Sequence, residues 1–413
     1  MTVLNAEQQE ACIKLHAFLD SDETEIKLLG KSGTGKTTVL AHFVAHLKKN
    51  IAIATLSHKA KTVIRGKIAI NTHIKFHTLA SLLNMKLNME TGDFSEEGKN
   101  PVIQSYDLII IDECSMVSVE TLALLRKKKS KKCKIIYAGD FRQLPPIGEK
   151  ASALEHDVSV NTIELHERVR QAAGNTILEY SDQYGEAGYT KVNPVRVDDE
   201  NMKFRTNFMS VLKEYESDFK QCLINPDVIK VVCYRNATKN QANNLIRETI
   251  FDKATEIPYQ TGDVIITNNN WNDIENSQEF TVIESVQLFE GNYLLHKIEA
   301  VKTNSLDQKH YFLFVLNELS VVHHKKDVSD LFDKYKKTKK REDLTNAWNL
   351  KQKYADVSYN FCCSSHRSQG SSFNKTVVIE DDIMKSFMSQ KEKNQCMYVV
   401  VTRSKEETII IKS

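Results

Sequence analysis

Residues 30–37 read G-K-S-G-T-G-K-T, which is a complete G-x-x-x-x-G-K-[S/T] phosphate loop. Its glycines let backbone N–H groups turn inward around phosphate oxygens, and the start of a following helix adds partial positive charge. Lys36 would neutralise the β- and γ-phosphate oxygens, and the Thr37 hydroxyl would bind Mg²⁺. The loop therefore predicts a site for a nucleoside triphosphate.

Two consecutive carboxylates, Asp112 and Glu113, end the most strand-like run of the chain. Residues 106–111 predict a central parallel strand, because such strands are apolar on both faces. Beside a phosphate loop, Asp112 can hold Mg²⁺ through water, and Glu113 can polarise a water for in-line attack on the γ-phosphate. With the loop, this pair predicts hydrolysis of the nucleotide rather than binding alone.

A further polar group follows the strand predicted at residues 135–140. Gln143 is expected beside Asp112 at the same edge of the sheet, where it could sense the γ-phosphate. The adjoining loop contains Pro145 and a second proline, which together make it stiff and unable to form a helix. Loss of the γ-phosphate could then be relayed from Gln143 to this loop.

Three side chains could reach the nucleotide from outside the loop. Gln8 lies in a helix that Asn5 is expected to begin, and its amide could read adenine, although a solvated glutamine is the commoner outcome. A phosphate loop with one lysine leaves transition-state charge partly uncompensated, so a guanidinium from elsewhere in the fold is expected. Arg170 and Arg403 are the candidates, with a surface salt bridge as the alternative for Arg170.

The elements that position these groups alternate between strand and helix. Residues 26–29 predict a buried strand before the loop, and residues 38–44 predict a helix after it. The second half repeats this alternation without a second phosphate loop, with strands expected at residues 229–234, 375–380 and 408–411. The pattern predicts an α/β fold in both halves.

Three segments interrupt the alternation. Residues 84–104 predict a small hairpin around a Thr-Gly turn, in which Met89 or Phe94 is either a wedge against base pairs or packing under the hairpin. Residues 262–316 contain short β-prone runs that predict a small antiparallel barrel or meander. Residues 325–354 predict a projecting, lysine-rich helical insertion, with a basic solvated face as the alternative.

Polar residues also follow the strand predicted at residues 50–54. In an open α/β sheet this edge is a natural ligand site, and Thr55 and His58 could grip a phosphodiester backbone. His77 precedes a second polar turn. For both histidines, a capping or core role is an equal alternative.

The composition narrows the classes of protein to consider. The 413 residues carry a formal net charge of +2, so any nucleic-acid surface must be local. The 8 cysteines include no C-x-x-C pair and no zinc spacing, which favours reduced thiols in a cytosolic protein. The chain shows no signal peptide, and its apolar runs are of strand length. We therefore expect a cytoplasmic protein (the host cytoplasm if phage-encoded) with no membrane partner.

Taken in order, the motifs resemble those of superfamily 1 helicases of the 1B, RecD-like branch, and the sequence looks most similar to phage Dda-type helicases. The resemblance covers almost the whole chain. Among its departures, Ser364 stands where the family usually has threonine, and Arg235-Asn236 replaces a Thr-Asn type of pair.

The resemblance implies a role for individual residues. Those implied in catalysis are Lys36, Glu113, Gln143, Arg170 and Arg403. Those implied in binding ATP are Gln8, Gly33, Thr34, Gly35, Lys36, Thr37, Thr38, Asp112 and Gly370, with Thr37 and Asp112 as the Mg²⁺ ligands. Those implied in contacting nucleic acid are Thr55, His58, His77, Pro145, Asn236, Ser364 and His366, with Met89 and Phe94 as candidates for splitting the duplex.

The resemblance also implies two RecA-like parallel-sheet domains with an inserted hairpin in the first and an SH3-like barrel with a helical extension in the second. The expected boundaries are 1–83 and 105–165 for the first domain, 84–104 for its hairpin, 166–261 and 355–413 for the second domain, and 262–354 for the barrel and helices.

The function implied by the resemblance is ATP-dependent translocation on single-stranded DNA in the 5′→3′ direction, with unwinding of duplex DNA at junctions. The expected protein is a monomer that works beside phage single-strand-binding or replication proteins. Two alternatives stay open, an ATP-dependent RNA helicase and an ATP-gated single-strand-binding remodeller that does not unwind. A metabolic kinase is a weaker alternative, because no small-molecule acceptor site is apparent.

Overall fold

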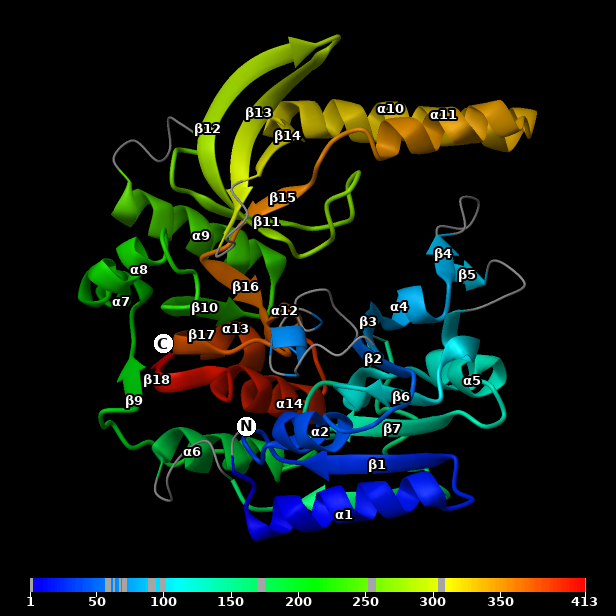
Figure 1. Ribbon diagram of the computed structural model, residues 1–413. Coiled ribbons are helices and arrows are strands. Elements are labelled where there is room, and N and C mark those ends of the chain that lie inside the picture. Colours follow the sequence, from blue (N-terminus) through cyan, green and yellow to red (C-terminus); the bar gives the residue numbers. More distant parts are fainter. Residues whose placement is uncertain are drawn as a thin grey trace.

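The computed structural model describes residues 3–55, 61, 64–66, 68, 73–87, 94–96, 102–146, 148–168, 175–251, 258–303 and 309–412. Two α/β lobes lie side by side, and a third, antiparallel sheet with a long helical pair projects beyond them (Figure 1). Among the described residues, no helix combines the length and apolar character that crossing a membrane requires.

The first lobe is built on a six-stranded sheet in the order β3-β2-β6-β7-β1-β8, with every pair parallel. Its strands are β1 (Glu25–Gly30), β2 (Ile51–Thr55), β3 (Ile74–Thr78), β6 (Leu108–Ile111), β7 (Lys134–Gly139) and β8 (Asn161–Leu165). Its helices are α1 (Ala6–Asp20), α2 (Lys36–Val44), α4 (Leu79–Leu82) and α5 (Val119–Lys128), with short 3-10 helices η1 (Val102–Ser105) and η2 (Cys114–Met116). The strands are apolar because both faces of the sheet are covered: Leu28 and Ile110 pack in one core, and Ile109 packs in the other.

The described part of the inserted hairpin consists of β4 (Met85–Leu87) and β5 (Phe94–Glu96), which pair antiparallel with Leu87 opposite Phe94. Met89 lies outside the described residues, and only the backbone of Phe94 is described. Their role in splitting a duplex therefore stays a prediction.

The second lobe has a five-stranded parallel sheet in the order β16-β10-β17-β18-β9. Its strands are β9 (Met202–Arg205), β10 (Ile229–Cys233), β16 (Cys362–Ser364), β17 (Phe373–Ile379) and β18 (Ser404–Ile411). Its helices are α6 (Thr176–Gly185), α7 (Phe208–Glu214), α8 (Glu216–Gln221), α9 (Asn236–Ile250), α12 (Ser365–Ser368), α13 (Glu380–Met384) and α14 (Gln390–Val401). The prediction of an α/β fold with two parallel-sheet lobes is confirmed.

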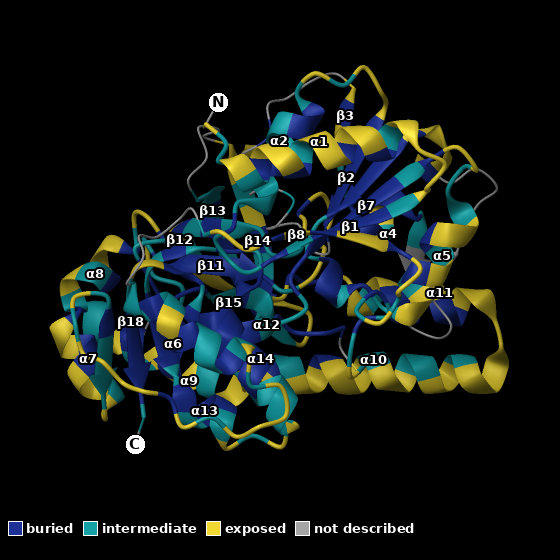
Figure 2. Cartoon of the chain, turned by 90° about the horizontal axis from the view of Figure 1, so that it is seen from below, coloured by how far each residue is buried: buried dark blue, intermediate teal, exposed yellow. Residues whose placement is uncertain are grey.

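The third sheet is antiparallel, in the order β14-β13-β12-β11-β15. Its strands are β11 (Val264–Thr267), β12 (Glu279–Glu290), β13 (Tyr293–Lys302), β14 (His310–Leu316) and β15 (Val357–Tyr359). The helices α10 (Glu318–Thr338) and α11 (Arg341–Lys351) form the projecting pair, and many of their residues are exposed, in contrast to the buried strands of the lobes (Figure 2). The SH3-like character of this sheet and the four domain boundaries stay predictions.

Candidate nucleotide and nucleic-acid site

The phosphate loop joins β1 to α2 and depends on left-handed glycines. Gly33 and Gly35 have φ angles of 89° and 84°, a region in which glycine is favoured. A Cβ on Gly35 would lie 2.3 Å from the amide nitrogen of Gln8, and one on Gly30 would lie 2.8 Å from the Leu165 carbonyl oxygen. No side chain caps the start of α2, so the N–H groups of its first turn can face phosphate oxygens. The loop fits the phosphates of a nucleotide.

The Lys36 ammonium lies against the loop that it is expected to serve. It donates to the carbonyl oxygens of Gly30 at 2.7 Å and Lys31 at 3.2 Å. Thr37 and Thr38 follow it in the first turn of α2. The structure therefore brings the lysine and both threonines to the helix start at which the partial positive charge of the dipole concentrates.

Gln8 is buried, and its amide is part of the scaffold of the loop. Its oxygen accepts the N–H of Asn5 at 3.2 Å, which completes a capping box at the start of α1, and its nitrogen donates to the carbonyl oxygen of Thr34 at 3.0 Å. The amide still has one N–H and one lone pair for other partners. Its reading of adenine stays a prediction.

The acidic pair follows β6 at the same edge of the sheet. Glu113 has a φ of 58°, a left-handed conformation that costs free energy in a residue other than glycine. Burial raises the pKa of the neighbouring Cys114 thiol, and the negative charges of Glu113 and Asp112 raise it further, whereas Lys36 lowers it. These four groups therefore lie in one region beside the phosphate loop.

The residues that would hold Mg²⁺ are Thr37, at the start of α2, and Asp112, at the end of β6. No group of three His, Cys, Asp or Glu side chains suited to a metal occurs in the part of the chain that the structure describes. Magnesium at a nucleotide site needs only one or two protein oxygens, because phosphate and water supply the other ligands. A hydroxyl and a carboxylate at these two positions fit that requirement.

The loop after β7 carries Gln143 and Pro145, both of which are buried. The end of β7 packs against the residue that follows the acidic pair, because a Cβ on Gly139 would lie 2.7 Å from the Cys114 sulfur. The side-chain oxygen of Gln143 is buried without a hydrogen-bond partner among the described residues. An unsatisfied buried amide oxygen is costly, so this atom is a candidate for binding a ligand or a water.

The second lobe contacts the phosphate loop directly. The Lys31 ammonium pairs with Asp182 at 3.0 Å and with Glu186 at 2.6 Å, at the end of α6. The Tyr398 hydroxyl, on α14, accepts the N–H of Ser32 at 3.0 Å. Both lobes therefore hold the loop that is expected to bind phosphate.

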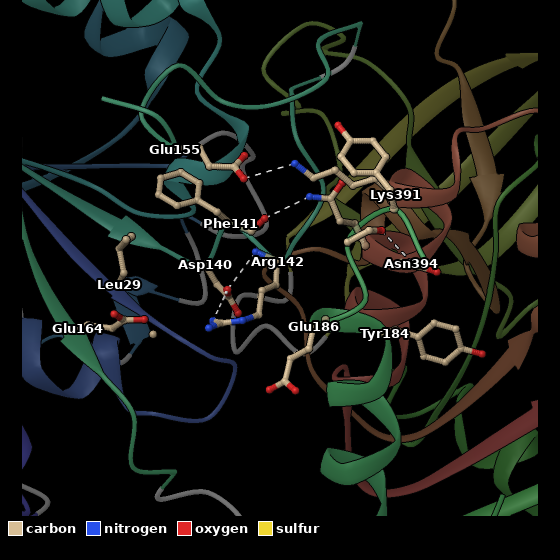
Figure 3. Close-up of a pocket in the computed structure, with 15 residues that line it drawn as sticks. Leu29, Asp140, Phe141, Arg142, Glu155, Glu164, Tyr184, Glu186, Lys391 and Asn394 are labelled. Atoms are coloured by element: carbon tan, nitrogen blue, oxygen red, sulfur yellow. Dashed lines mark hydrogen bonds and ion pairs between the residues drawn. The ribbon is translucent and has the colours of Figure 1, made fainter. Parts of the chain in front are cut away.

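A cavity of about 410 Å³ lies between the lobes beside this contact (Figure 3). Gly30, Arg142 and Glu164 line it from the first lobe, and Tyr184 and Lys391 line it from the second. Neither the lysine of the loop nor the acidic pair lines it. We interpret it as free space between the lobes that adjoins the phosphate site.

Of the two predicted arginines, the structure describes only Arg403. Arg170 lies outside the described residues. Arg403 is buried, and its guanidinium donates within the second lobe to the carbonyl oxygens of Val399 at 3.0 Å and Ser371 at 3.3 Å. Its role at the γ-phosphate stays a prediction.

The predicted nucleic-acid residues of the first lobe lie at the ends of two adjacent strands. Thr55 ends β2 and is paired in register with Thr78, next to His77. His77 contacts the Tyr106 hydroxyl at 2.7 Å, and burial, with the charges of nearby lysines, lowers the pKa of its imidazole. His58 lies outside the described residues. The neutral, half-buried His77 suits a positioning role as well as a direct contact.

The corresponding residues of the second lobe lie at the ends of β10 and β16, which are adjacent strands. Asn236 is exposed at the start of α9, and Ser364 caps α12 by accepting the Arg367 N–H at 3.4 Å. His366 lies in α12, where burial lowers the pKa of its imidazole. Gly370, which is predicted to bind ATP rather than nucleic acid, has a φ of 71°. Both lobes therefore present predicted nucleic-acid residues at the carboxyl ends of parallel strands.

Comparisons with known proteins agree with this geometry. Residues 3–191 match the family model described as an AAA domain. The uncharacterized protein R530 of Acanthamoeba polyphaga mimivirus is 27% identical, with 98% of this chain and 99% of that protein covered. The RecD subunit of the RecBCD enzyme of Buchnera aphidicola is 24% identical over 68% of this chain, which spans 48% of that protein's length.

The solved structures similar to this chain include Pif1 helicases. The Pif1 helicase from Bacteroides in complex with ADP-AlF3 and single-stranded DNA has a TM-score of 0.54 at 16% identity, and the alignment covers 99% of this chain and 92% of that one. The chain shares the fold of these Pif1 helicases. Within this helicase fold, the narrower resemblance to Dda-type proteins stays a prediction.

Several residues that belong to the site were not predicted as candidates from the sequence. Arg168 donates to Asp182 at 2.5 Å and lines a second opening between the lobes with Arg142. Lys31 and Tyr398 join the lobes at the phosphate loop. Arg168 lies two positions before Arg170, and nothing in the sequence indicates that it pairs with Asp182 of α6.

Proposed function

We propose that this chain is an ATP-dependent DNA helicase that moves along single-stranded DNA in the 5′→3′ direction and unwinds duplex DNA. The observation that carries the proposal is the contact between the lobes. The loop expected to hold ATP phosphates is bonded on one side to its own sheet and on the other to α6 and α14 of the second lobe. A change at the phosphates therefore acts directly on the position of the second lobe.

ATP hydrolysis is assigned to groups of the first lobe. Lys36 offsets the charge of the β- and γ-phosphates from the start of α2, and Glu113 orients the attacking water. We assign to the unsatisfied oxygen of Gln143 the role of accepting a hydrogen bond from that water. A bound Mg²⁺, held by Thr37 and Asp112, would supply charge neutralisation at the phosphate oxygens.

Binding of a nucleic-acid strand across both lobes is supported by the matching positions of polar residues. Thr55 and His77 lie at the ends of strands of one sheet. In the other sheet Ser364 ends β16, and Asn236 begins the helix after β10. Hydroxyl, amide and imidazole groups at such positions can hold phosphates without reading the base sequence. If each lobe grips the strand alternately, opening and closing of the lobes becomes stepping.

The choice of DNA is supported by the relatives, since the similar Pif1 structure contains single-stranded DNA. A single copy of the chain carries both lobes, which supports action as a monomer. Single-strand-binding or replication proteins are the partners that a protein acting on exposed single strands would meet.

The experiment that tests the proposal measures ATP hydrolysis with and without single-stranded DNA or RNA, and unwinding of duplexes with a 5′ or a 3′ tail. We expect DNA to stimulate turnover and only 5′-tailed duplexes to be unwound. Unwinding from 3′ tails would reverse the direction, and stimulation by RNA alone would favour an RNA helicase. Stimulation by DNA without unwinding would favour a single-strand-binding remodeller.

The hairpin is assigned the separation of the strands. Replacing Phe94 and Met89 by alanine should reduce unwinding while DNA-stimulated ATP hydrolysis continues. Unwinding that stays at the rate of the unchanged protein would exclude both side chains as the wedge.

A further inference from the structure

Tyr398 reaches from the core of the second lobe to the phosphate loop of the first. Its ring is 0% exposed and packs in the core that contains Tyr184 and Leu144. A Cβ on Gly185, at the end of α6, would lie 2.9 Å from this ring, so the absence of a side chain at Gly185 leaves room for the tyrosine. The ring is therefore held in a core that consists mainly of second-lobe residues and includes Leu144 of the first lobe.

The hydroxyl of this tyrosine makes two hydrogen bonds to the first lobe. It accepts the N–H of Ser32 at 3.0 Å and donates to the Asp140 carboxylate at 2.6 Å. Burial raises the pKa of Tyr398, and the negative charge of Asp140 raises it further, so the phenol keeps its proton at neutral pH. Donation to a carboxylate also polarises the hydroxyl and strengthens it as an acceptor.

Both partners of the hydroxyl belong to the nucleotide site. Ser32 lies within the phosphate loop, whose N–H groups are the donors expected to face phosphate. Asp140 follows β7 and accepts the N–H of Arg142 at 3.1 Å, just before Gln143. In the other direction, the Tyr398 carbonyl accepts the Thr402 hydroxyl at 2.9 Å, next to Arg403. One side chain thus connects the loop, the end of β7 and the end of α14.

We propose that Tyr398 is a positioning residue that couples nucleotide binding to the arrangement of the lobes, by competing with phosphate for the N–H of Ser32. Phosphate entering the loop takes this N–H and leaves the hydroxyl bonded to Asp140 alone. The bond between the loop and α14 is thereby exchanged for a bond between the loop and the nucleotide. The coupling of the lobes to nucleic-acid movement rests on the proposed function, whereas the competition for the Ser32 N–H concerns nucleotide binding only.

The test uses the Tyr398→Phe variant of the full chain, which removes the hydroxyl and keeps the ring. Equilibrium binding of a fluorescent ATP analogue, without DNA, measures the competition. Because one competing hydrogen bond is lost, we expect binding to tighten about threefold to tenfold. The KM for ATP should fall. The kcat with single-stranded DNA should fall at least about fivefold, because the lobes lose the hydrogen bond that aligns them.

Tyr180→Phe is the matched control, since it removes another buried hydroxyl from the same core without touching the first lobe. It should lower thermal stability by a similar amount and leave nucleotide affinity, KM and kcat unchanged. A Tyr398→Phe protein that binds the analogue no more tightly than the unchanged protein overturns the proposal. So does a Tyr180→Phe protein that tightens binding equally.

Asp140→Asn provides a second variant should Tyr398→Phe fail to fold. It weakens the acceptor of the same hydroxyl, so it should tighten analogue binding in the same direction by a smaller factor, and unchanged or weaker binding overturns the proposal. Absence of DNA-stimulated turnover and of unwinding in the unchanged protein would refute the helicase function instead, while the affinity measurement would still decide the role of Tyr398.

Discussion

The two lobes use the same strand–loop–helix unit in opposite ways. In the first lobe β1 leads into α2, whose start has no side-chain cap and follows a glycine-rich loop. In the second lobe β10 leads into α9, and the approach to that helix is occupied by the Asp382 carboxylate. One of its oxygens accepts the N–H groups of Tyr234 at 2.7 Å and Arg235 at 2.8 Å.

This difference shows that phosphate binding is a property of the loop and not of the parallel-sheet fold. N–H groups before a helix attract an anion in either lobe. The first lobe leaves them for a ligand, whereas the second satisfies them with its own carboxylate, which also accepts the Thr238 hydroxyl at 2.6 Å. A built-in anion fixes the exposed Asn236 at the start of α9, where the lobe is proposed to contact nucleic acid.

The largest expected effect comes from removing the cation of the first lobe. Lys36→Ala should lower kcat/KM for ATP by about 10⁴-fold, because charge-assisted hydrogen bonds are lost in both binding and the transition state. A steady-state ATPase assay measures this. The control is Lys14→Ala, at an exposed lysine of the same lobe, and this variant should retain full turnover. The buried Lys27 is unsuitable as a control position. Turnover near normal in Lys36→Ala would remove the loop from catalysis.

Glu113→Gln should separate binding from hydrolysis in the same lobe. The amide cannot orient and polarise the water as a carboxylate does, so kcat should fall about 10²- to 10³-fold while ATP remains bound. Single-turnover hydrolysis and filter binding measure the two steps. Rapid hydrolysis by this variant would exclude Glu113 as the base.

Asp382→Asn should remove the negative charge that occupies the approach to α9 in the second lobe. Burial alone would raise the pKa of the Asp382 carboxyl. The hydrogen bonds from Thr238 and Arg235 outweigh burial and hold this pKa below its ordinary value of 3.8. The variant should lose about 2–3 kcal/mol of unfolding free energy at neutral pH, measured by urea denaturation. It should gain no nucleotide binding, because the second lobe lacks the glycines and the lysine.

The stability difference between this variant and the unchanged protein should depend on pH. A carboxyl whose pKa is lowered by folding contributes stability above its unfolded pKa, and that contribution is lost as the pH falls. The difference should therefore narrow as the pH falls below the ordinary value of 3.8. A difference that stays constant through the acid range would show that the negative charge of Asp382 is not its source.

The smallest effect is expected at Asn236. Asn236→Ala should weaken binding of single-stranded DNA about twofold to fivefold, because one exposed hydrogen bond is lost, and should leave ATPase activity without DNA unchanged. Fluorescence anisotropy with a labelled oligonucleotide measures this. Asn240→Ala, one turn further along α9, is the matched control, and an equal loss there would remove any special role from Asn236.

Much of the first lobe was predictable because its signals are local. The residues around Lys36, the apolar run before Asp112 and the capping Asn5 each specify their structure within a few positions, and the structure has a loop, a strand and a helix start there. The second lobe was predictable as alternating strands and helices, since buried parallel strands are apolar. The carboxylate that occupies the approach to α9 was not predictable, because Asp382 lies more than a hundred residues beyond β10.

The sequence alone determined which atoms could handle a phosphate: the glycines, the lysine and threonine of the loop, and two acidic residues after an apolar strand. Tertiary structure alone decided that Tyr398 and Asp182 contact that loop, that Arg168 pairs with Asp182, and that the guanidinium of Arg403 donates to Val399. The physical reason is that backbone conformation and amphipathic pattern are encoded over a few residues. The meeting of two lobes depends instead on how whole sheets and helices pack.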